Sequence, residues 1–260
     1  MGILNVTPDS FSDGGRFVGR DAALRQAEAM LAAGADLLDV GGESTRPGAA
    51  NVTAEQELER VVPVLEALRD LSDVPVSIDT SKPAVMRAAV AAGAALVNDV
   101  RALREDGAVA AVAELGVPVC LMHMQGAPRT MQAAPDYADV CGEVAAFLAA
   151  RLAVCTAAGI PPDSIVLDPG FGFGKSAAHN VELLANLREL ARLGRPLLVG
   201  LSRKSTLGQL TGRDVSDRLA ASVAAAVIAV LNGASIVRVH DVAETVDALC
   251  VARAVMAAGN

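Results

Sequence analysis

The residues with the clearest chemical potential form one stretch, Asp168-Pro-Gly-Phe-Gly-Phe-Gly-Lys175. An apolar run over residues 164–167 precedes it and is typical of a buried strand, so a carboxylate stands at that strand's end. The glycines allow tight turns or a close approach of the backbone to a ligand, and Phe171 and Phe173 offer flat faces. This combination suits a planar, nitrogen-rich ring. The alternative is an ordinary loop between a strand and a helix, since glycine-rich loops are common.

A repeating strand–helix unit is expected to position this stretch. Alanine-rich segments end near a glycine, a short apolar run follows, and polar residues end the run. The glycines stand where a helix C-terminus takes up left-handed backbone, namely at Gly34, Gly93, Gly116, Gly159, Gly194 and Gly233. The expected strands lie within residues 2–6, 37–40, 74–78, 95–97, 118–122, 164–167, 196–199 and 236–237.

Helices are expected between these strands. Asp21 is expected to cap the first, over residues 21–33, and Thr53 with Gln56 forms a capping box for the second. Ser81 and Pro83 are expected to open the third. The others cover roughly residues 107–115, 135–158, 178–193, 216–231 and 243–258. Uniformly apolar strands alternating with helices predict an α/β fold, a (β/α)8 TIM barrel forming a single domain over residues 1–260. An open doubly wound sheet is the alternative.

Composition limits the partners and the compartment. The 260 residues carry a formal net charge of −8, so the basic face of a nucleic-acid-binding protein is not expected. The four cysteines lack metal-binding spacing and lie in apolar surroundings, which favours reduced thiols in a cytoplasmic protein. No signal-peptide pattern occurs, and no uncharged apolar run approaches the roughly 20 residues of a membrane span. No nucleic-acid or membrane partner is therefore expected, while small anionic substrates remain compatible with the composition if a few Arg and Lys converge locally.

Polar residues end all the expected strands, which a purely structural role explains poorly. In a (β/α)8 barrel the carboxyl ends of the strands surround the mouth where the chemistry occurs. These positions hold Asn5, Asp39 with Glu43, Asp79, Asn98 with Asp99, His123, Asp168, Arg203 with Lys204, and Arg238 with His240. Some of the acids would only cap the next helix, and His123, which has no companion, is expected to be structural.

Loop composition adds two further indications. Four of the five phenylalanines lie in glycine-containing loops, and this use of scarce aromatic residues favours ring binding, with loop packing as the alternative. They are Phe11, Phe17, Phe171 and Phe173, of which Phe17 fits loop packing better. Residues 7–15 and 41–48 combine glycine, hydroxyl groups and, in the second loop, Arg46, so they could surround a diphosphate. Neither loop matches a nucleotide-binding motif, and a solvated turn is the alternative.

Several segments together resemble the bacterial dihydropteroate synthases, a group of pterin-binding barrels. They are residues 1–15, 41–48, 78–80, 98–100, 122–126, 168–175, 202–205 and 238–241, and they span essentially the whole chain. The resemblance implies a transferase of folate biosynthesis that condenses 6-hydroxymethyl-7,8-dihydropterin diphosphate with para-aminobenzoate, giving 7,8-dihydropteroate and diphosphate. It also implies Mg²⁺ as cofactor, inhibition by sulfonamides, and a homodimer formed through the later helices.

The same resemblance assigns the site residues. The implied pterin pocket consists of Asp79, Asn98, Met122, Asp168 and Lys204. The implied diphosphate site consists of Asn5, Arg46, Arg238 and His240, with Asn5 also a ligand of Mg²⁺. The implied aminobenzoate site consists of Thr45, Pro47, Phe173, Lys204 and Ser205. The implied catalytic set is Asn5, Asp79, Asp168, Lys204, Arg238 and His240.

Two departures from the family pattern occur. Thr206 follows Ser205 where the family often has a large apolar residue, and the chain starts on its first strand without the short leader of many members. Neither departure falls on an assigned ligand contact, and the second is expected to cost stability rather than activity.

The residue types favour a dissociative displacement. An arylamine is already neutral near neutral pH, and no Ser/His/Asp nucleophile set occurs. Arginine, histidine and Mg²⁺ can assist a leaving diphosphate, while Asp79 and Asp168 can stabilise a cationic pterin methylene. A pterin-binding methyltransferase is one alternative, although it would not need the diphosphate loops or Ser-Arg-Lys-Ser. A non-catalytic pterin-binding paralogue is another, and the intact set of Asn5, Arg46, Arg238 and His240 argues against it.

Overall fold

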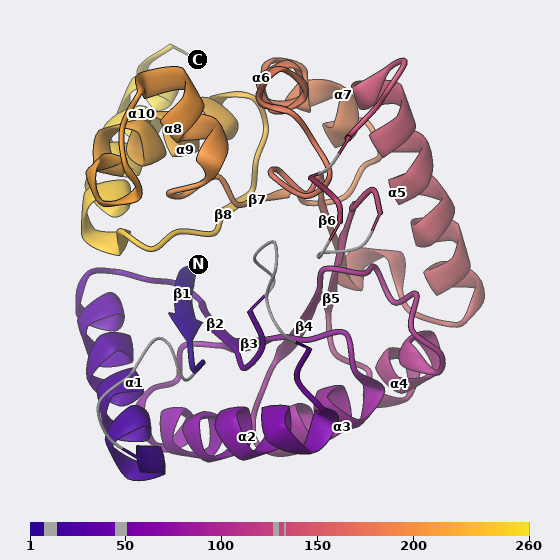
Figure 1. Cartoon of the computed structure of the whole chain (residues 1–260), viewed down its shortest axis with the longest axis vertical. Coiled ribbons are helices and arrows are strands. Elements are labelled where there is room, and N and C mark those ends of the chain that lie inside the picture. The colour runs from indigo at the N-terminus through magenta and orange to yellow at the C-terminus, as the bar shows by residue number, and fades with distance from the viewer. Residues whose placement is uncertain (8–14, 45–50, 127–129, 133, 260) are drawn as a thin grey trace.

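The computed structural model describes residues 1–7, 15–44, 51–126, 130–132 and 134–259, of which residues 15–18 are described by backbone alone. The helices surround the strands (Figure 1). The strands are β1 (Gly2–Asn5), β2 (Leu38–Gly41), β3 (Val76–Asp79), β4 (Leu96–Asp99), β5 (Val119–Met122), β6 (Ile165–Asp168), β7 (Leu198–Val199) and β8 (Ile236–Val237). The helices are α1 (Gly15–Ala32), α2 (Ala54–Leu71), α3 (Pro83–Ala91), α4 (Ala108–Leu115), α5 (Val140–Ala157), α6 (Ala177–Ala185), α7 (Leu187–Ala191), α8 (Ser205–Thr211), α9 (Leu219–Leu231) and α10 (Val242–Ala258).

The parallel strands close into a ring. Strands β1 to β6 pair in chain order, and β7 pairs with β8. A parallel bridge between Leu167 and Leu197 joins the end of β6 to the start of β7, and one between Gly2 and Val239 joins β8 to β1. The (β/α)8 barrel predicted from the sequence is thereby confirmed, because a doubly wound sheet would leave its outermost strands unpaired.

Apolar side chains fill the space on both faces of the strands. Leu4, Ile78 and Leu121 lie in a large cluster between the strands and the helices. A second cluster comes from four neighbouring strands and fills the barrel interior; it consists of Leu96, Cys120, Val166 and Leu198. Burial of each such side chain contributes about 1.5–3 kcal/mol. Because both faces are covered, the strands are uniformly apolar instead of alternating.

Most expected elements agree with the structure. All six glycines predicted to end helices have positive φ, from 65° to 117°, and the capping box of Thr53 with Gln56 is present. Asp21 does not cap α1, because that helix already begins at Gly15. The helix expected over residues 178–193 is divided into α6 and α7 at Asn186. Helix α8 was not expected from the sequence.

Helix α5 is long and apolar enough, by length and composition, to cross a membrane. Its packing shows a different role, because Val144 and Leu148 are fully buried in the barrel core. Arg151 on the same helix donates to the carbonyl oxygens of Ala102 and Leu103, at 2.8 and 3.1 Å. Only 28% of this helix is buried and Val154 is 45% exposed, so contact with the barrel accounts for part of its apolar sequence.

Candidate active site

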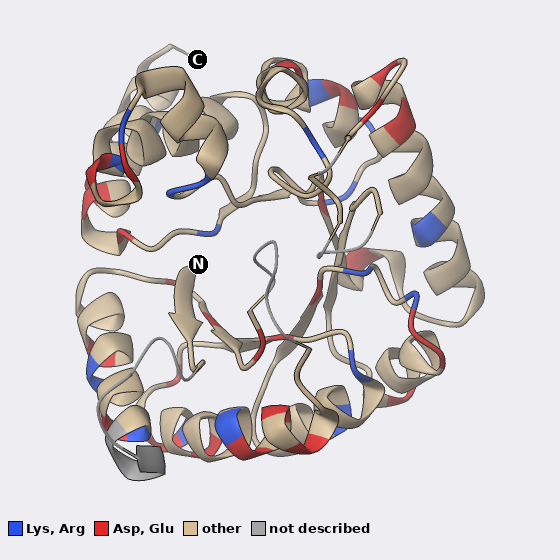
Figure 2. Cartoon of the chain, viewed as in Figure 1, with Lys and Arg blue, Asp and Glu red and all other residues tan. Residues whose placement is uncertain are grey.

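The carboxyl ends of the strands bring the polar residues together at one end of the barrel. Figure 2 shows acidic and basic segments in the centre of the ring, among the strands and the loops that follow them, in addition to those on the outer helices. In parallel register, Gly41 pairs with Asp79, Asp79 with Asn98, and Met122 with Asp168. The residues that the sequence marked as strand ends are thus neighbours around the mouth.

Arg238 links two carboxylates across the barrel. Its Nε donates to Oδ2 of Asp39 at 2.5 Å, and its Nη2 donates to Oδ2 of Asp79 at 3.0 Å. The Asn98 amide donates to the same Asp39 oxygen at 3.1 Å. Asp39 is completely buried, whereas the Arg238 side chain keeps 20% exposure. One network therefore connects β2, β3, β4 and the residue after β8, and it orients Asp79 and Asn98.

Burial and charge act in opposite directions within this network. Burial raises the pKa of Asp79, and the Arg238 guanidinium opposes that rise. Burial alone would lower the pKa of Arg238, but Asp39 and Asp79 raise it above its ordinary value. Arg238 therefore keeps its positive charge at the mouth, where it can attract an anionic group.

Asp168 and Lys204 form the opposite side of the mouth. Oδ1 of Asp168 accepts a hydrogen bond from the Gly170 N–H at 2.7 Å. The Lys204 ammonium donates to the Phe171 carbonyl and lies 4.5 Å from the centre of the Phe173 ring. Burial lowers the pKa of Lys204 to about 8, with Asp168 opposing the change. The lysine is thus a cation held against an aromatic face and close to its deprotonation point.

An apolar surface lies beside these charges. Met122 belongs to a buried cluster with Val100, Met124 and Met131, and Phe173 packs against that cluster while remaining partly exposed. Methionine sulfur is polarisable and makes favourable contacts with rings. The mouth therefore combines carboxylates that accept hydrogen bonds with a surface on which a flat ring can stack.

The remaining site residues lie on neighbouring ends of strands and helices. Ser202 Oγ accepts from the His240 backbone N–H at 3.2 Å and lies 3.0 Å from His240 Nδ1. When the serine hydroxyl donates to Nδ1, the imidazole proton resides on Nε2, which is then a donor. Ser205 is exposed in the first turn of α8, and Asn5 ends β1 with Gly41 as its register partner.

Several expectations can be compared with these positions. Thr45, Arg46, Pro47 and Phe11, and the side chain of Phe17, lie outside the described residues. The expectation that Phe171 offers a ring face is wrong, because its side chain is fully buried in the main core.

Two strand-end residues have structural roles: Asp99 stabilises a turn instead of capping the next helix, and His123 is structural, as expected. Asp99 accepts from the backbone N–H groups of Arg101 and Leu103 at 2.8 and 2.7 Å, so it stabilises the turn after β4. His123 is buried with its ring edge against Phe147, and burial lowers its pKa to about 3.

Sequence reasoning assigned no role to two residues that shape the site. Asp39 anchors Arg238 and Asn98; its signal was a lone carboxylate inside an apolar strand. Lys175 is buried and donates to the carbonyls of Gly170 and Phe173 at 2.9 and 3.2 Å, and its ammonium lies 2.9 Å from Nδ1 of His123. The loop after β6 is therefore folded around the buried amine of Lys175, whose pKa burial lowers to about 7.

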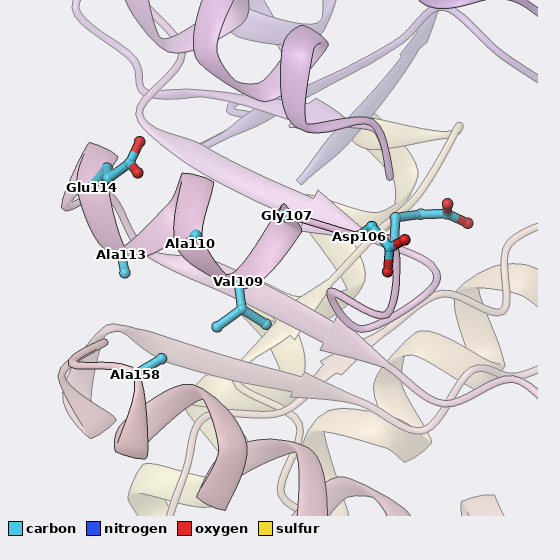
Figure 3. Close-up of a pocket in the computed structure, with 8 residues that line it drawn as sticks. Asp106, Gly107, Val109, Ala110, Ala113, Glu114 and Ala158 are labelled. Carbon is cyan, nitrogen blue, oxygen red and sulfur yellow. The ribbon is translucent and has the colours of Figure 1, made fainter.

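A surface cavity of about 600 Å³ lies outside the barrel mouth, between α4 and the end of α5. Figure 3 shows Val109 directed towards the end of α5 at Ala158, with the carboxylates of Asp106 and Glu114 at the two ends of the short helix. None of the residues that line it belongs to the network around Arg238 or Lys204, so the barrel mouth is the candidate site.

Comparisons with known proteins agree with this geometry. Residues 1–240 match the model of the pterin binding enzyme family. The dihydropteroate synthase of Escherichia coli K12 is 55% identical over 258 residues, which cover 99% of this chain and 92% of that protein. A crystal structure of the Yersinia pestis dihydropteroate synthase with a sulfonamide drug complex superposes with a TM-score of 0.95 at 56% identity, covering 99% of this chain and 94% of that chain.

A further solved structure holds the product. The Xanthomonas albilineans dihydropteroate synthase in complex with 7,8-dihydropteroate has a TM-score of 0.91 and 53% identity to this chain, over 99% of this chain and 93% of that one. The chain therefore belongs to the family of pterin-binding enzymes. Within that family, it falls among the dihydropteroate synthases, which are transferases.

Proposed function

We propose that the chain condenses 6-hydroxymethyl-7,8-dihydropterin diphosphate with para-aminobenzoate, giving 7,8-dihydropteroate and diphosphate in folate biosynthesis. The observation that carries this is the arrangement of Asp79, Asn98 and Asp168 around one mouth, with Arg238 and Lys204 as the cations beside them. The identity of more than half of the residues to dihydropteroate synthases over nearly the whole chain supports the same conclusion.

The pterin ring is held by carboxylates, an amide and an apolar surface. Asp79 and Asp168 accept from the ring N–H groups, Asn98 offers an amide oriented by Asp39, and Lys204 donates to the ring's carbonyl side. Met122 lies under the ring. A dihydropterin presents several N–H donors along one edge, so buried acceptors are the groups that recognise it.

The diphosphate leaves from the pterin methylene towards Arg238 and His240. The methylene carbon–oxygen bond breaks, and its electron pair goes to the diphosphate oxygen, where the guanidinium and the imidazole N–H stabilise the new charge. Asp79 and Asp168 stabilise the positive charge left on the pterin. The arylamine nitrogen then forms the new carbon–nitrogen bond and releases its proton to water.

Mg²⁺ is the proposed cofactor. Among the described residues, no group of three His, Cys, Asp or Glu side chains that could hold a metal ion occurs. Asn5 offers an amide oxygen at the end of β1. This donor set fits Mg²⁺, which commonly binds through one or two protein oxygens together with substrate phosphates and water. When bound, the ion supplies charge neutralisation for the leaving diphosphate.

Para-aminobenzoate is proposed to lie against Phe173, Lys204 and Ser205, with Thr45 and Pro47 completing the site. The cation beside the Phe173 ring suits a flat arene that carries a carboxylate. Sulfonamides present the same arylamine, so they are expected to compete with para-aminobenzoate. Arg46 is proposed to bind the diphosphate with Asn5.

The test is product formation by the purified protein. Diphosphate release and 7,8-dihydropteroate are both measured with Mg²⁺ and the two substrates, and again without para-aminobenzoate. The proposal requires product only in the complete mixture and a loss of rate in Arg238→Met. Methyl transfer in place of diphosphate release would support the methyltransferase alternative, and pterin binding without product would support the paralogue.

A homodimer and a cytoplasmic location are also proposed. Exposed apolar side chains gather on the neighbouring helices α9 and α10; they are Ile228, Leu231, Val251, Val255 and Met256. A patch of this kind is typical of an interface between copies of a chain. The cysteines are free thiols, three of them buried, which fits a reducing compartment.

A further inference from the structure

A buried asparagine connects two walls of the mouth. Asn180 lies in α6, is 2% exposed, and carries no role in the assignments above. Its Oδ1 accepts from the Gly172 N–H at 2.9 Å, and its Nδ2 donates to the Ser176 carbonyl at 2.8 Å and to Thr206 Oγ1 at 3.0 Å. Since a backbone N–H can only donate, these contacts fix which amide atom is oxygen. Thr206 Oγ1 is the nearer acceptor for the second N–H of this amide, since the Lys175 carbonyl lies farther away, at 3.5 Å.

Thr206 supplies that acceptor from the other wall. It lies in the first turn of α8, directly after Ser205, and is 4% exposed. The sequence marked this position as one where related chains often carry a large apolar residue, which has no oxygen to offer. In this chain the hydroxyl joins α8 to α6, and through Asn180 to the loop after β6.

Gly172, the loop residue that Asn180 binds, stands between the two residues that contact Lys204. Gly172 follows Phe171, whose carbonyl accepts from the Lys204 ammonium, and precedes Phe173, whose ring lies 4.5 Å from it. The Gly172 backbone has φ of 77°, and a Cβ there would lie 3.0 Å from Cδ of Lys204. A displacement of Gly172 would therefore move both contacts of the lysine together.

We propose that Asn180 and Thr206 are positioning residues that set the spacing between Phe173 and Lys204, and thereby the fit of para-aminobenzoate. The inference rests on the proposed function of this mouth. Lys204 also belongs to the proposed pterin pocket, but Asp79 and Asn98 of that pocket have a separate anchor, because Arg238 and Asp39 hold them on other strands. Loss of the link between Asn180 and Thr206 acts on para-aminobenzoate far more than on the pterin.

The test compares two substitutions of nearly unchanged shape. Thr206→Val removes the nearer acceptor and leaves one buried N–H with only the long contact to the Lys175 carbonyl, so KM for para-aminobenzoate rises about tenfold. KM for the pterin diphosphate rises less than KM for para-aminobenzoate, because Lys204 is one of several proposed pterin contacts, and kcat changes less than about twofold. Thr206→Ser keeps the hydroxyl and restores the KM. Thr211→Val, at the far end of α8, is the matched control, since its hydroxyl bonds only within that region.

Two readouts separate this role from a merely structural one. A fall in the unfolding temperature of Thr206→Val with an unchanged KM for para-aminobenzoate overturns the inference, as does an equal rise in KM for both substrates. Calorimetric titration of para-aminobenzoate into protein loaded with pterin, diphosphate and Mg²⁺ gives the same comparison without turnover. A wild-type protein that forms no dihydropteroate overturns the proposed function. The Kd values of para-aminobenzoate for the wild type and for Thr206→Val, compared by calorimetry, still decide the role of Asn180 and Thr206.

Discussion

At the scale of single residues, recognition depends on acceptors that are buried before the substrate arrives. One carboxylate oxygen of Asp168 accepts a hydrogen bond from the Gly170 N–H at 2.7 Å, so the other oxygen is left for a ligand in the mouth. Asp168→Asn keeps the size of the side chain but places an amide donor where a ring N–H must be accepted. Each buried group left unpaired costs about 1–3 kcal/mol, so the Kd for the pterin rises roughly ten- to a hundredfold.

Calorimetry with the pterin diphosphate measures this change, and Asp163→Asn is its control. Asp163 lies just before the same strand with its carboxylate in solvent, where it pairs with Arg195. Binding by Asp163→Asn is expected to match the wild type. An unchanged Kd in Asp168→Asn would remove Asp168 from the pterin site.

Lys204 gives the site a pH dependence with a defined sign. Burial lowers its pKa from 10.5 to about 8, so the ammonium is present below that value and is lost as the pH rises through it. Burial raises the pKa of Asp79 to about 8, so that carboxylate ionises over the same range. Because kcat/KM reports groups of the free enzyme, loss of the Lys204 charge is expected to lower it above a pH of about 8. Arginine stays protonated throughout this range, so Lys204→Arg lacks the fall even if its overall rate is lower. If kcat/KM falls with pH in the same way in the wild type and in Lys204→Arg, a group other than Lys204 causes the fall.

At the scale of elements, the loop after β6 is defined by close backbone contacts. Gly170 has φ of 69°, and a Cβ there would lie 1.8 Å from the carbonyl oxygen of His123. Gly212 has nearly the same φ, 70°, with nothing within 4 Å of its Cβ position. Gly212→Ala is therefore expected to cost about 1–2 kcal/mol for the left-handed backbone alone. Gly170→Ala carries the same cost and in addition moves the loop away from His123.

The two glycine variants are compared by urea unfolding and by the KM values of both substrates. The expected result is a larger loss of unfolding free energy in Gly170→Ala and weaker binding of both substrates, with KM values unchanged in Gly212→Ala. Equal losses in the two variants would mean that the loop can relax around the added methyl group.

The same loop shows which features the sequence could predict. The strands were predictable because each is a short apolar run, and six of the eight follow a glycine that ends a helix; the polar ends followed from barrel geometry. Phe171 and Phe173 are alike in sequence context, yet one is buried in the core and the other lines the mouth, because the left-handed backbone of Gly172 between them turns the two rings in different directions. Asp39 and Asp79 both belong to strands. Only their depth in the barrel distinguishes Asp39, which anchors other side chains, from Asp79, which is proposed to face the ligand.

Helix α8 was not predicted for a similar reason. It has seven residues and is preceded by Arg203, whose backbone is left-handed with φ of 58°. That conformation is uncommon for arginine, and it is held by contacts made from distant segments: Ser222 accepts from the Arg203 N–H, and Asp241 pairs with the guanidinium. A short helix that depends on such contacts leaves little local signal.

At the scale of the whole molecule, the proposed catalytic mouth and the proposed dimer interface lie on different parts of the barrel. The mouth is built by strand ends and loops, whereas the exposed apolar patch lies on the outer faces of α9 and α10, which pack beside each other (Figure 1). Val251 and Val255 are 65% and 66% exposed and lie one helical turn apart, so they share a face. Two copies that join these faces would remove this apolar surface from water.

A charge in the centre of the patch is expected to prevent assembly without changing the mouth. Val251→Glu combined with Val255→Glu would place carboxylates in the proposed contact, where burying unpaired charge is costly, so the protein becomes a monomer at micromolar concentration. Val154→Glu, at an exposed apolar position on α5, is the control and stays dimeric. Sedimentation equilibrium measures the association state, and kcat measured on the same samples is expected to stay within about twofold of wild type, because each mouth is formed by one chain. A wild-type protein that sediments as a monomer, or a double variant that still dimerises, would show that this face is not the interface.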